Sequence, residues 1–193
     1  MTTIYKVGDQ SIQPGRSWKD ASGTVQPKNW NIWSAEEKKA AGIKEVVLQP
    51  FPDKRLYTSS HTATGSVTSK NKPLDDTNEV DKDGKPILDA NGKQLVTLGV
   101  KSKLKNEIKD QQQSLLFQTD WAVIRKADKG TEIPANIQTW RDAIRAKATE
   151  MEEAIDKASS TKAMEALFVK YTTDSDGKTT KSGILYDWPE LAE

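Results

Sequence analysis

The sequence predicts an α+β protein in which a small β-rich N-terminal domain is followed by an antiparallel helical hairpin plus a short third helix. Short β-prone stretches separated by Gly and Pro turns fill the N-terminal half. Residues 100–127 contain no Gly or Pro and are rich in Lys, Gln, Glu and Leu, which is typical of a helix. We expect residues 1–98 to form the β-rich domain with one short helix, 99–171 the helical hairpin module, and 172–193 a tail with an apolar anchor.

The composition excludes several classes of function. The 29 Lys plus Arg and 28 Asp plus Glu leave a net charge of +1, which argues against a nucleic-acid-binding protein that works by bulk electrostatics. The absence of Cys excludes disulfides, thiolate catalysis and zinc sites built on sulfur. No apolar run approaches the ~18 residues of a membrane span, so no membrane contact is expected. Leu, Ile, Val and Phe make up only about a fifth of the chain, which predicts a thin core.

The β-rich part is predicted to hold short strands and one short helix. The expected strands and extended segments are 3–7, 17–25, 45–49 and 55–70. Ser34 and Glu37 form a capping box that begins a helix of about two turns. A helix this short depends on packing, which we expect from Trp30, Trp33 and Ile43.

Residues 78–98 show a hairpin pattern. Asp83-Gly84 and Asn91-Gly92 are strong two-residue turn signals between apolar residues. The Asp-x-x-Gly-Lys pattern around them occurs twice in succession, which is too short for a solenoid repeat. We therefore interpret the repeat as two local turns.

Two long helices joined by a short loop are predicted next. The first covers residues 100–127 and stops before Gly130, and Pro134 is well placed near the first position of the second helix. The second helix carries an apolar stripe made of Ile137, Trp140, Ile144, Ala148, Met151, Ile155 and Ala158. This stripe packs either on the neighbouring helix or on a second copy of the chain, so a homo-oligomer stays open. A third, short helix is predicted over Ala163–Tyr171.

Motifs that would carry chemistry are weak. Asp81-x-Asp83-Gly84 and Asp174-x-Asp176-Gly177 resemble calcium loops, but the twelfth loop position is Ala90 in one and Ser182 in the other, where a bidentate acid is required. His61 is the single histidine, and no nucleophile elbow accompanies it. No phosphate-binding glycine loop occurs either. We expect no catalytic residue, no cofactor and no metal.

One group of residues predicts a structural clasp in the hairpin. Asp120 precedes Trp121 near the end of the expected first helix, where an acid is unfavourable against the helix dipole. Arg141 or Arg145 at the start of the second helix can supply a cation in bidentate geometry. We expect Trp121 and Trp140 to pack beside that ion pair and shield it.

The same segment resembles known families. The run from Leu115 to Trp121, then Ile133-Pro134, then Trp140-Arg141-x-x-Ile144-Arg145 resembles the phage tail assembly chaperone and tail-fibre assembly families, and the closing Trp188-Pro189 is similar to theirs. The stretch from Trp33 to Ile43 is similar to the N-terminal part of hypothetical phage tail proteins. The resemblance implies a non-enzymatic bacteriophage tail protein, either a virion tail or tail-fibre component or a tail assembly factor. It would act in the virion or in the host cytoplasm during assembly, through contacts with other phage tail or tail-fibre proteins.

Partner contacts are expected at two aromatic or apolar segments. A sheet of short strands has exposed edges and little apolar area, so it gains from a neighbouring chain. The predicted contact residues are Trp30, Trp33, Ile184, Leu185, Tyr186, Trp188 and Pro189. The alternative functions are a carbohydrate-binding module that uses Trp18, Trp30 or Trp33, and a small hydrolase on the β-rich half.

Overall fold

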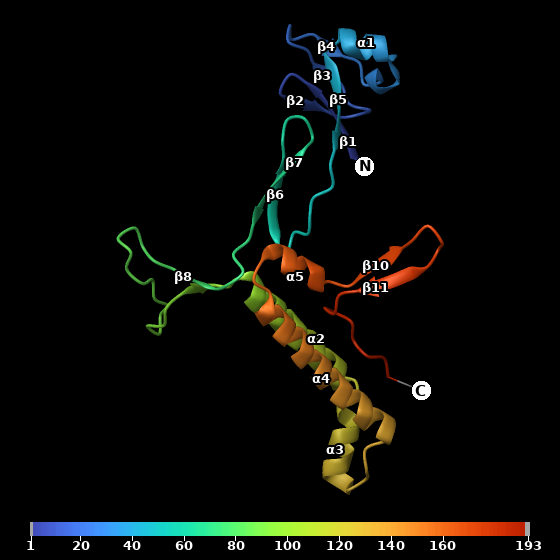
Figure 1. Cartoon of the computed structure of the whole chain (residues 1–193). Helices are drawn as coiled ribbons and strands as arrows, with labels where there is room; N and C mark the ends of the chain where they lie inside the picture. The colour runs from blue at the N-terminus through green and yellow to red at the C-terminus, as the bar shows by residue number, and fades with distance from the viewer. Residues whose placement is uncertain (1, 192–193) are drawn as a thin grey trace. The chain divides into compact units, whose positions relative to one another are not determined.

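A computed structural model describes residues 2–191 of the chain (Figure 1). It confirms the α+β class, because small antiparallel sheets and helices occur together. The chain separates into two compact units, with the division between Lys70 and Asn71. We expected the division near residue 98. Residues 71–99 instead belong to the helical unit, since the Val100 N–H donates to the Pro73 carbonyl oxygen (2.9 Å) and the Gly99 N–H donates to the Asp76 carboxylate (2.7 Å).

The first unit is built around a three-stranded antiparallel sheet. Its central strand β1 (Thr2–Val7) pairs with β2 (Gln10–Ile12) on one side and with β5 (Ile43–Leu48) on the other. The remaining elements are β3 (Trp18–Lys19), β4 (Val25–Gln26), the 3-10 helix η1 (Trp30–Ile32), α1 (Ala35–Ala40), β6 (Tyr57–His61) and β7 (Val67–Asn71). The pairs β3–β4 and β6–β7 are separate two-stranded ribbons. The three-stranded sheet is therefore the largest sheet among the described residues of this unit.

A small aromatic core holds the first unit together. Ile12, Trp18, Trp30 and Ile43 are buried together. The Trp30 ring meets the Tyr5 ring edge-on at 5.1 Å between centroids, and its Nε1 donates to the Arg16 carbonyl oxygen at 2.9 Å. Trp30 therefore combines a large apolar contact area with a satisfied polar atom.

The predicted capping box is present at the start of α1. The Ser34 Oγ accepts the Glu37 N–H at 3.2 Å, and the Glu37 carboxylate accepts the Ser34 N–H at 2.7 Å. The backbone bond from Ser34 lowers the pKa of the Glu37 carboxyl. Two donors that the helix cannot satisfy are thus paired reciprocally.

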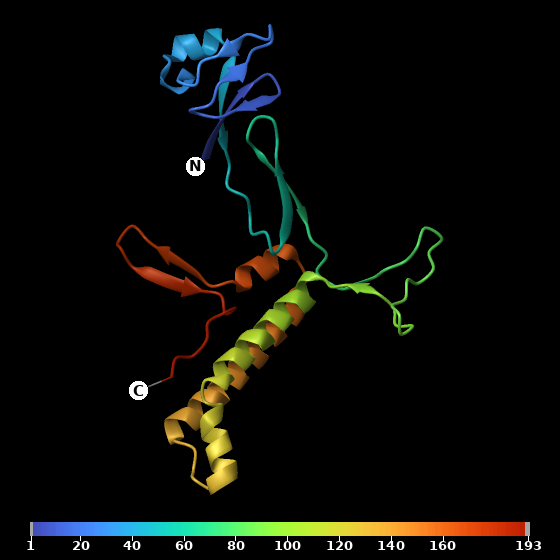
Figure 2. The same cartoon turned by 180° about the vertical axis from the view of Figure 1, so that it is seen from behind.

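The second unit is built on two long helices. α2 (Val100–Phe117) and α4 (Ala135–Lys157) lie side by side and run in opposite directions (Figures 1 and 2). The other elements are β8 (Thr77–Asn78), β9 (Val96–Thr97), α3 (Asp120–Lys129), α5 (Thr161–Leu167), β10 (Lys170–Thr173) and β11 (Thr179–Ser182). All seven residues of the predicted apolar stripe are buried, which confirms that this face of α4 packs within the chain.

The expected first helix is interrupted. The chain leaves the α-helix after Phe117 and begins α3 at Asp120. At the break the Gln118 and Thr119 N–H groups bond three residues back, to the Leu115 and Leu116 carbonyl oxygens (3.2 and 3.1 Å). A tighter turn thus replaces one turn of α-helix, and the helix resumes in a new direction.

The third helix is shorter than the sequence predicts. α5 ends at Leu167, and Tyr171 lies in β10 with an exposed side chain. The Leu167 carbonyl oxygen accepts the N–H groups of Ile184 and Leu185 (2.8 and 2.9 Å). The backbone after Leu167 therefore pairs with a segment distant in sequence, which the helical pattern could not reveal.

Candidate partner-binding surface

Arg141 on α4 is the centre of the clasp. Its Nη1 donates to the Leu116 carbonyl oxygen and to Thr119 Oγ1, both at 2.8 Å. Its Nη2 lies 2.9 Å from Asp120 Oδ1, so one guanidinium contacts the end of α2, the break and the start of α3. The Arg141 side chain is 7% exposed, whereas that of Asp120 is 43% exposed. The buried guanidinium of Arg141 therefore stabilises the break between α2 and α3.

Asp120 meets Arg141 as expected, but the dipole argument that led there is wrong. Asp120 is the first residue of α3, where the helix dipole favours an acid. Arg145 is not part of the clasp, because its Nη1 pairs with Asp142 on its own helix at 3.0 Å and its side chain is exposed. The cation requirement comes from the carbonyl and hydroxyl oxygens at the break.

The two tryptophans of the predicted clasp lie in different environments. Trp140 is buried, and its Nε1 donates to the Pro189 carbonyl oxygen at 2.9 Å. Trp121 is 51% exposed and does not shield the ion pair. Pro134 stands at the N-cap of α4, one position earlier than expected. The expectation of an aromatic lid over the pair is wrong for Trp121, since the break turns α3 away from α4's apolar stripe.

The break leaves an apolar surface at the end of the hairpin. Phe117 is 75% exposed, Trp121 51% and Ile124 66%. We call these three residues the hairpin-tip patch. The buried residue of α3 is the small Ala122, so the helix has little apolar contact with the rest of its unit. Of the three residues, only Trp121 was expected to pack, beside the ion pair. The signal for an exposed patch is that α4 offers a single apolar stripe to these large side chains.

The C-terminal anchor docks on its own helices. Leu185 is fully buried, the Tyr186 hydroxyl donates to Glu107 at 2.7 Å, and Trp188 Nε1 donates to Gln111 Oε1 at 2.7 Å. Both acceptors are on α2. Ile184 is half-buried in the same segment. The expectation that this anchor is a free partner surface is therefore wrong, since its aromatic N–H and O–H groups are already paired within the chain.

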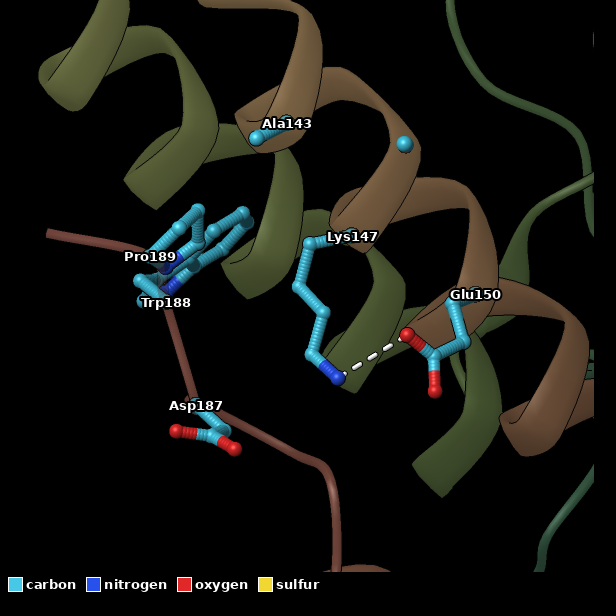
Figure 3. A pocket seen from close by; sticks show the side chains of 7 residues that line it. Ala143, Lys147, Glu150, Asp187, Trp188 and Pro189 are labelled. Carbon is cyan, nitrogen blue, oxygen red and sulfur yellow. Dashed lines mark hydrogen bonds and ion pairs between the residues drawn. The ribbon is translucent and has the colours of Figure 1, made fainter. Parts of the chain in front are cut away.

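A shallow groove remains beside the docked anchor. Figure 3 shows Trp188 and Pro189 near α4, opposite Lys147 and Glu150. Lys147 Nζ lies 2.9 Å from the Glu150 carboxylate, so the two charges satisfy each other. The groove has a volume of about 470 Å³ and opens to solvent. The groove is open to solvent and its Lys147 and Glu150 charges are paired with each other, so its lining does not present a nucleophile with an adjacent base.

The N-terminal tryptophans are core residues. Trp30 is fully buried and Trp18 is 5% exposed, so neither reaches a partner or a sugar. Trp33 is half-buried against the same aromatic core. The predicted partner contact is wrong for Trp30, and the flat aromatic platform of a carbohydrate-binding module does not form from Trp18 and Trp30. A core with so few aliphatic residues uses these rings to supply its apolar area.

The remaining sequence candidates make local contacts. His61 Nε2 is 2.8 Å from the Gln49 carbonyl oxygen, and its ring lies against Phe51 with centroids 4.2 Å apart. The Oδ1 atoms of Asp81 and Asp174 each accept two backbone N–H groups within their turns. Within residues 2–191, no group of three or more His, Asp or Glu side chains is arranged to hold a metal ion.

The described helices include none with the length and apolarity needed to cross a membrane. Comparison of the chain with family models, with curated proteins and with solved structures finds no match.

Proposed function

We propose that this chain is a non-enzymatic bacteriophage tail protein, a virion tail or tail-fibre component or a tail assembly factor, that binds another tail protein through the hairpin-tip patch. The observation that carries the proposal is the exposure of Phe117, Trp121 and Ile124 at a helix break held by a buried arginine. Large apolar side chains gathered on the surface of a polar chain mark sites of protein–protein contact. The break also lies inside the segment that resembles the tail assembly families.

The geometry of the break favours binding. Arg141 contacts three acceptors around it, so the backbone beneath the patch is fixed before a partner arrives. A surface ordered in advance loses less conformational entropy on association. Arg125 and Asp128 lie one helical turn after Trp121 and Ile124 on α3 and are exposed, so charged side chains border the patch. An apolar centre with a polar rim is the usual organisation of a protein interface.

The direct test is a double substitution, Trp121→Ser with Ile124→Ser. The variant and the parent chain are immobilised and mixed with soluble tail and tail-fibre components purified from phage particles. We expect the variant to lose at least tenfold in affinity, because exposed aromatic anchors dominate such interfaces. Tyr171→Ser is the matched control, since Tyr171 is 67% exposed on β10 in the same unit.

Circular dichroism of both variants checks that the helices are retained. Unchanged binding by a folded double variant contradicts the proposal. His61→Ala should bind like the parent chain, and a loss of function with retained folding would favour the hydrolase instead. Mass spectrometry of mature particles then separates a subunit that stays from an assembly factor that leaves.

A further inference from the structure

Residues 77–97 form an arrangement that the sequence pattern did not reveal. Three backbone groups close a ring of hydrogen bonds: the Glu79 N–H donates to Leu95, the Leu95 N–H to Ile87, and the Ile87 N–H to Glu79, at 2.8, 2.8 and 3.0 Å. These residues are spaced by eight along the chain. The chain bends at each of these three central residues. The residue before the bend pairs with one neighbouring stretch of chain, and the residue after the bend pairs with the other. We call the result the three-ribbon star.

The pairing repeats three times around the centre. Val80 pairs with Pro86, Leu88 with Gln94, and Val96 with Asn78, all antiparallel. Two ribbons end in Asp-x-x-Gly-Lys turns, which project from the segment labelled β8 in Figure 1, and the third ribbon, β8–β9, leads to α2. Directly paired residues and residues two apart share a face of a sheet. All six residues of these pairs therefore lie on one face of the star.

Gln94 fixes the centre of that face. Its Nε2 lies 2.6 Å from the Glu79 carbonyl oxygen, 3.2 Å from that of Ile87 and 3.1 Å from that of Leu95. One side-chain amide thus caps the three central carbonyl groups. The backbone at the centre is satisfied, so the star needs no additional polar partner.

Three aliphatic side chains surround Gln94 at equivalent positions. Val80 is 53% exposed, Leu88 52% and Val96 39%. We call them the star triad. Two-stranded ribbons are marginally stable by themselves, and none of residues 77–97 is buried, so no apolar core formed by the star accounts for aliphatic residues on this face. The turns carry Asp and Lys in equal number, so net charge does not select the partner.

We propose that the star triad docks on the threefold axis at the end of a homotrimeric tail or tail-fibre protein. On such an axis, Val80, Leu88 and Val96 each meet the same apolar position in one of three identical partner chains. The threefold repeat of the backbone pairing and of the aliphatic triad carries this choice of partner, because one favourable contact is then made three times. The proposal rests on the proposed function and adds the symmetry of the partner and a ratio of one copy to three partner chains.

The absence of Cys makes a site-specific test direct. Val80→Cys, Leu88→Cys and Val96→Cys are each labelled with a benzophenone maleimide and illuminated with the homotrimeric tail or tail-fibre protein purified from particles. We expect all three variants to crosslink to one and the same partner peptide. Tyr171→Cys is the matched control, because Tyr171 is 67% exposed on β10, outside the star, and it should give no such product. Native mass spectrometry should show one copy per three partner chains.

Each other outcome overturns the proposal. Three different partner peptides would show an asymmetric contact, and crosslinks between copies of this chain would show self-association instead. If the triad variants do not crosslink while Trp121→Ser with Ile124→Ser abolishes binding, the star proposal fails and the proposed function stands. If the parent chain binds no tail component, both fail together.

Discussion

At the scale of single residues, Arg141 shows how a buried charge can be structural. Its guanidinium is removed from water, and the lost hydration is replaced by the Leu116 carbonyl oxygen, Thr119 Oγ1 and the Asp120 carboxylate. Its Nε has no hydrogen-bond partner among the described residues, so the replacement is incomplete. Removing the cation leaves Thr119 Oγ1 without a donor and takes one of three donors from the Leu116 carbonyl oxygen, whereas removing Asp120 leaves a cation that keeps two partners.

Arg141→Ala should therefore destabilise the helical unit by about 3 kcal/mol. Asp120→Ala should cost about 1 kcal/mol, because that carboxylate is half-exposed and solvent screens the pair. Arg145→Ala is the control and should change stability by less than about 0.5 kcal/mol, since its side chain is on the surface. Urea unfolding followed by circular dichroism measures all three. Equal losses for Arg141→Ala and Arg145→Ala would contradict the clasp.

Asp76 predicts a pH dependence. The Gly99 N–H and then the Ser102 side chain bond its carboxylate and lower its pKa below the usual 3.8. Its pKa is lower in the folded chain than in the unfolded chain. Its contribution to stability is therefore complete above about pH 4 and is lost as the pH falls through the folded pKa. Asp76→Asn should reduce the acid-induced loss of stability between about pH 4 and pH 2.

The measurement is urea unfolding of the parent chain and Asp76→Asn at a series of pH values. Asp110→Asn, exposed on α2, is the control and should keep the acid-induced loss. Identical pH profiles for the parent and Asp76→Asn would show that the bond to Gly99 does not contribute.

At the scale of elements, one turn is used repeatedly. The turns that begin at Asp20, Thr62, Asp81, Asp89 and Asp174 share the same backbone bonds, in which the first residue's N–H donates to the carbonyl oxygen four positions later. In the four that begin with Asp, its Oδ1 also accepts two backbone N–H groups. The fourth residue is a glycine at positive φ in each case. The turn chemistry is thus encoded within five residues and needs no core.

The star depends on its central amide as much as on its turns. Gln94→Glu keeps the size of the side chain but replaces the N–H donor with an acceptor at neutral pH. An oxygen facing the carbonyls of Glu79, Ile87 and Leu95 repels them, so the centre should open. We expect hydrogen exchange of these three amides to accelerate by at least tenfold, with the α2 amides unchanged. Gln112→Glu, on α2, is the control for the added charge, and unchanged exchange in Gln94→Glu would refute the role of the amide.

At the scale of the whole molecule, the helical unit is completed by the C-terminal segment. Leu185 is buried beside Phe168, and the anchor after it bonds α2 through Tyr186 and Trp188 and α4 through the carbonyl of Pro189. Gly183 permits this close approach, because a Cβ there would lie 2.2 Å from the Phe168 carbonyl oxygen. A chain with few aliphatic residues thus gains apolar area from its own tail.

Leu185→Ala should therefore destabilise the helical unit by about 2–5 kcal/mol, the usual cost of such a cavity. Leu191→Ala is the matched control, since Leu191 is 41% exposed in the same segment, and it should cost less than about 0.5 kcal/mol. Thermal unfolding measures both. Removing the chain from Ile184 onward should lower the unfolding temperature at least as much as Leu185→Ala. An unchanged unfolding temperature would show that the anchor is not part of the fold.

The sequence by itself determined the features that depend on nearby residues. The stripe from Ile137 to Ala158 placed α4, Ser34 and Glu37 placed the start of α1, and Asp-Gly and Asn-Gly marked the turns. The sequence also predicted that Asp120 pairs with Arg141 or Arg145, and the structure selects Arg141.

Only the tertiary structure decided the features that depend on contacts between distant segments. At the break at Gln118–Thr119, Arg141 on a distant helix donates to the Leu116 carbonyl oxygen and Thr119 Oγ1, and Trp121 after the break is 51% exposed. The anchor's docking and the closure of the star likewise depend on backbone and side-chain bonds between segments whose local patterns predict a tail and separate hairpins. Local sequence patterns indicate helix propensity and turn chemistry. The break, the docked anchor and the star instead depend on hydrogen bonds between donors and acceptors that are far apart in the sequence.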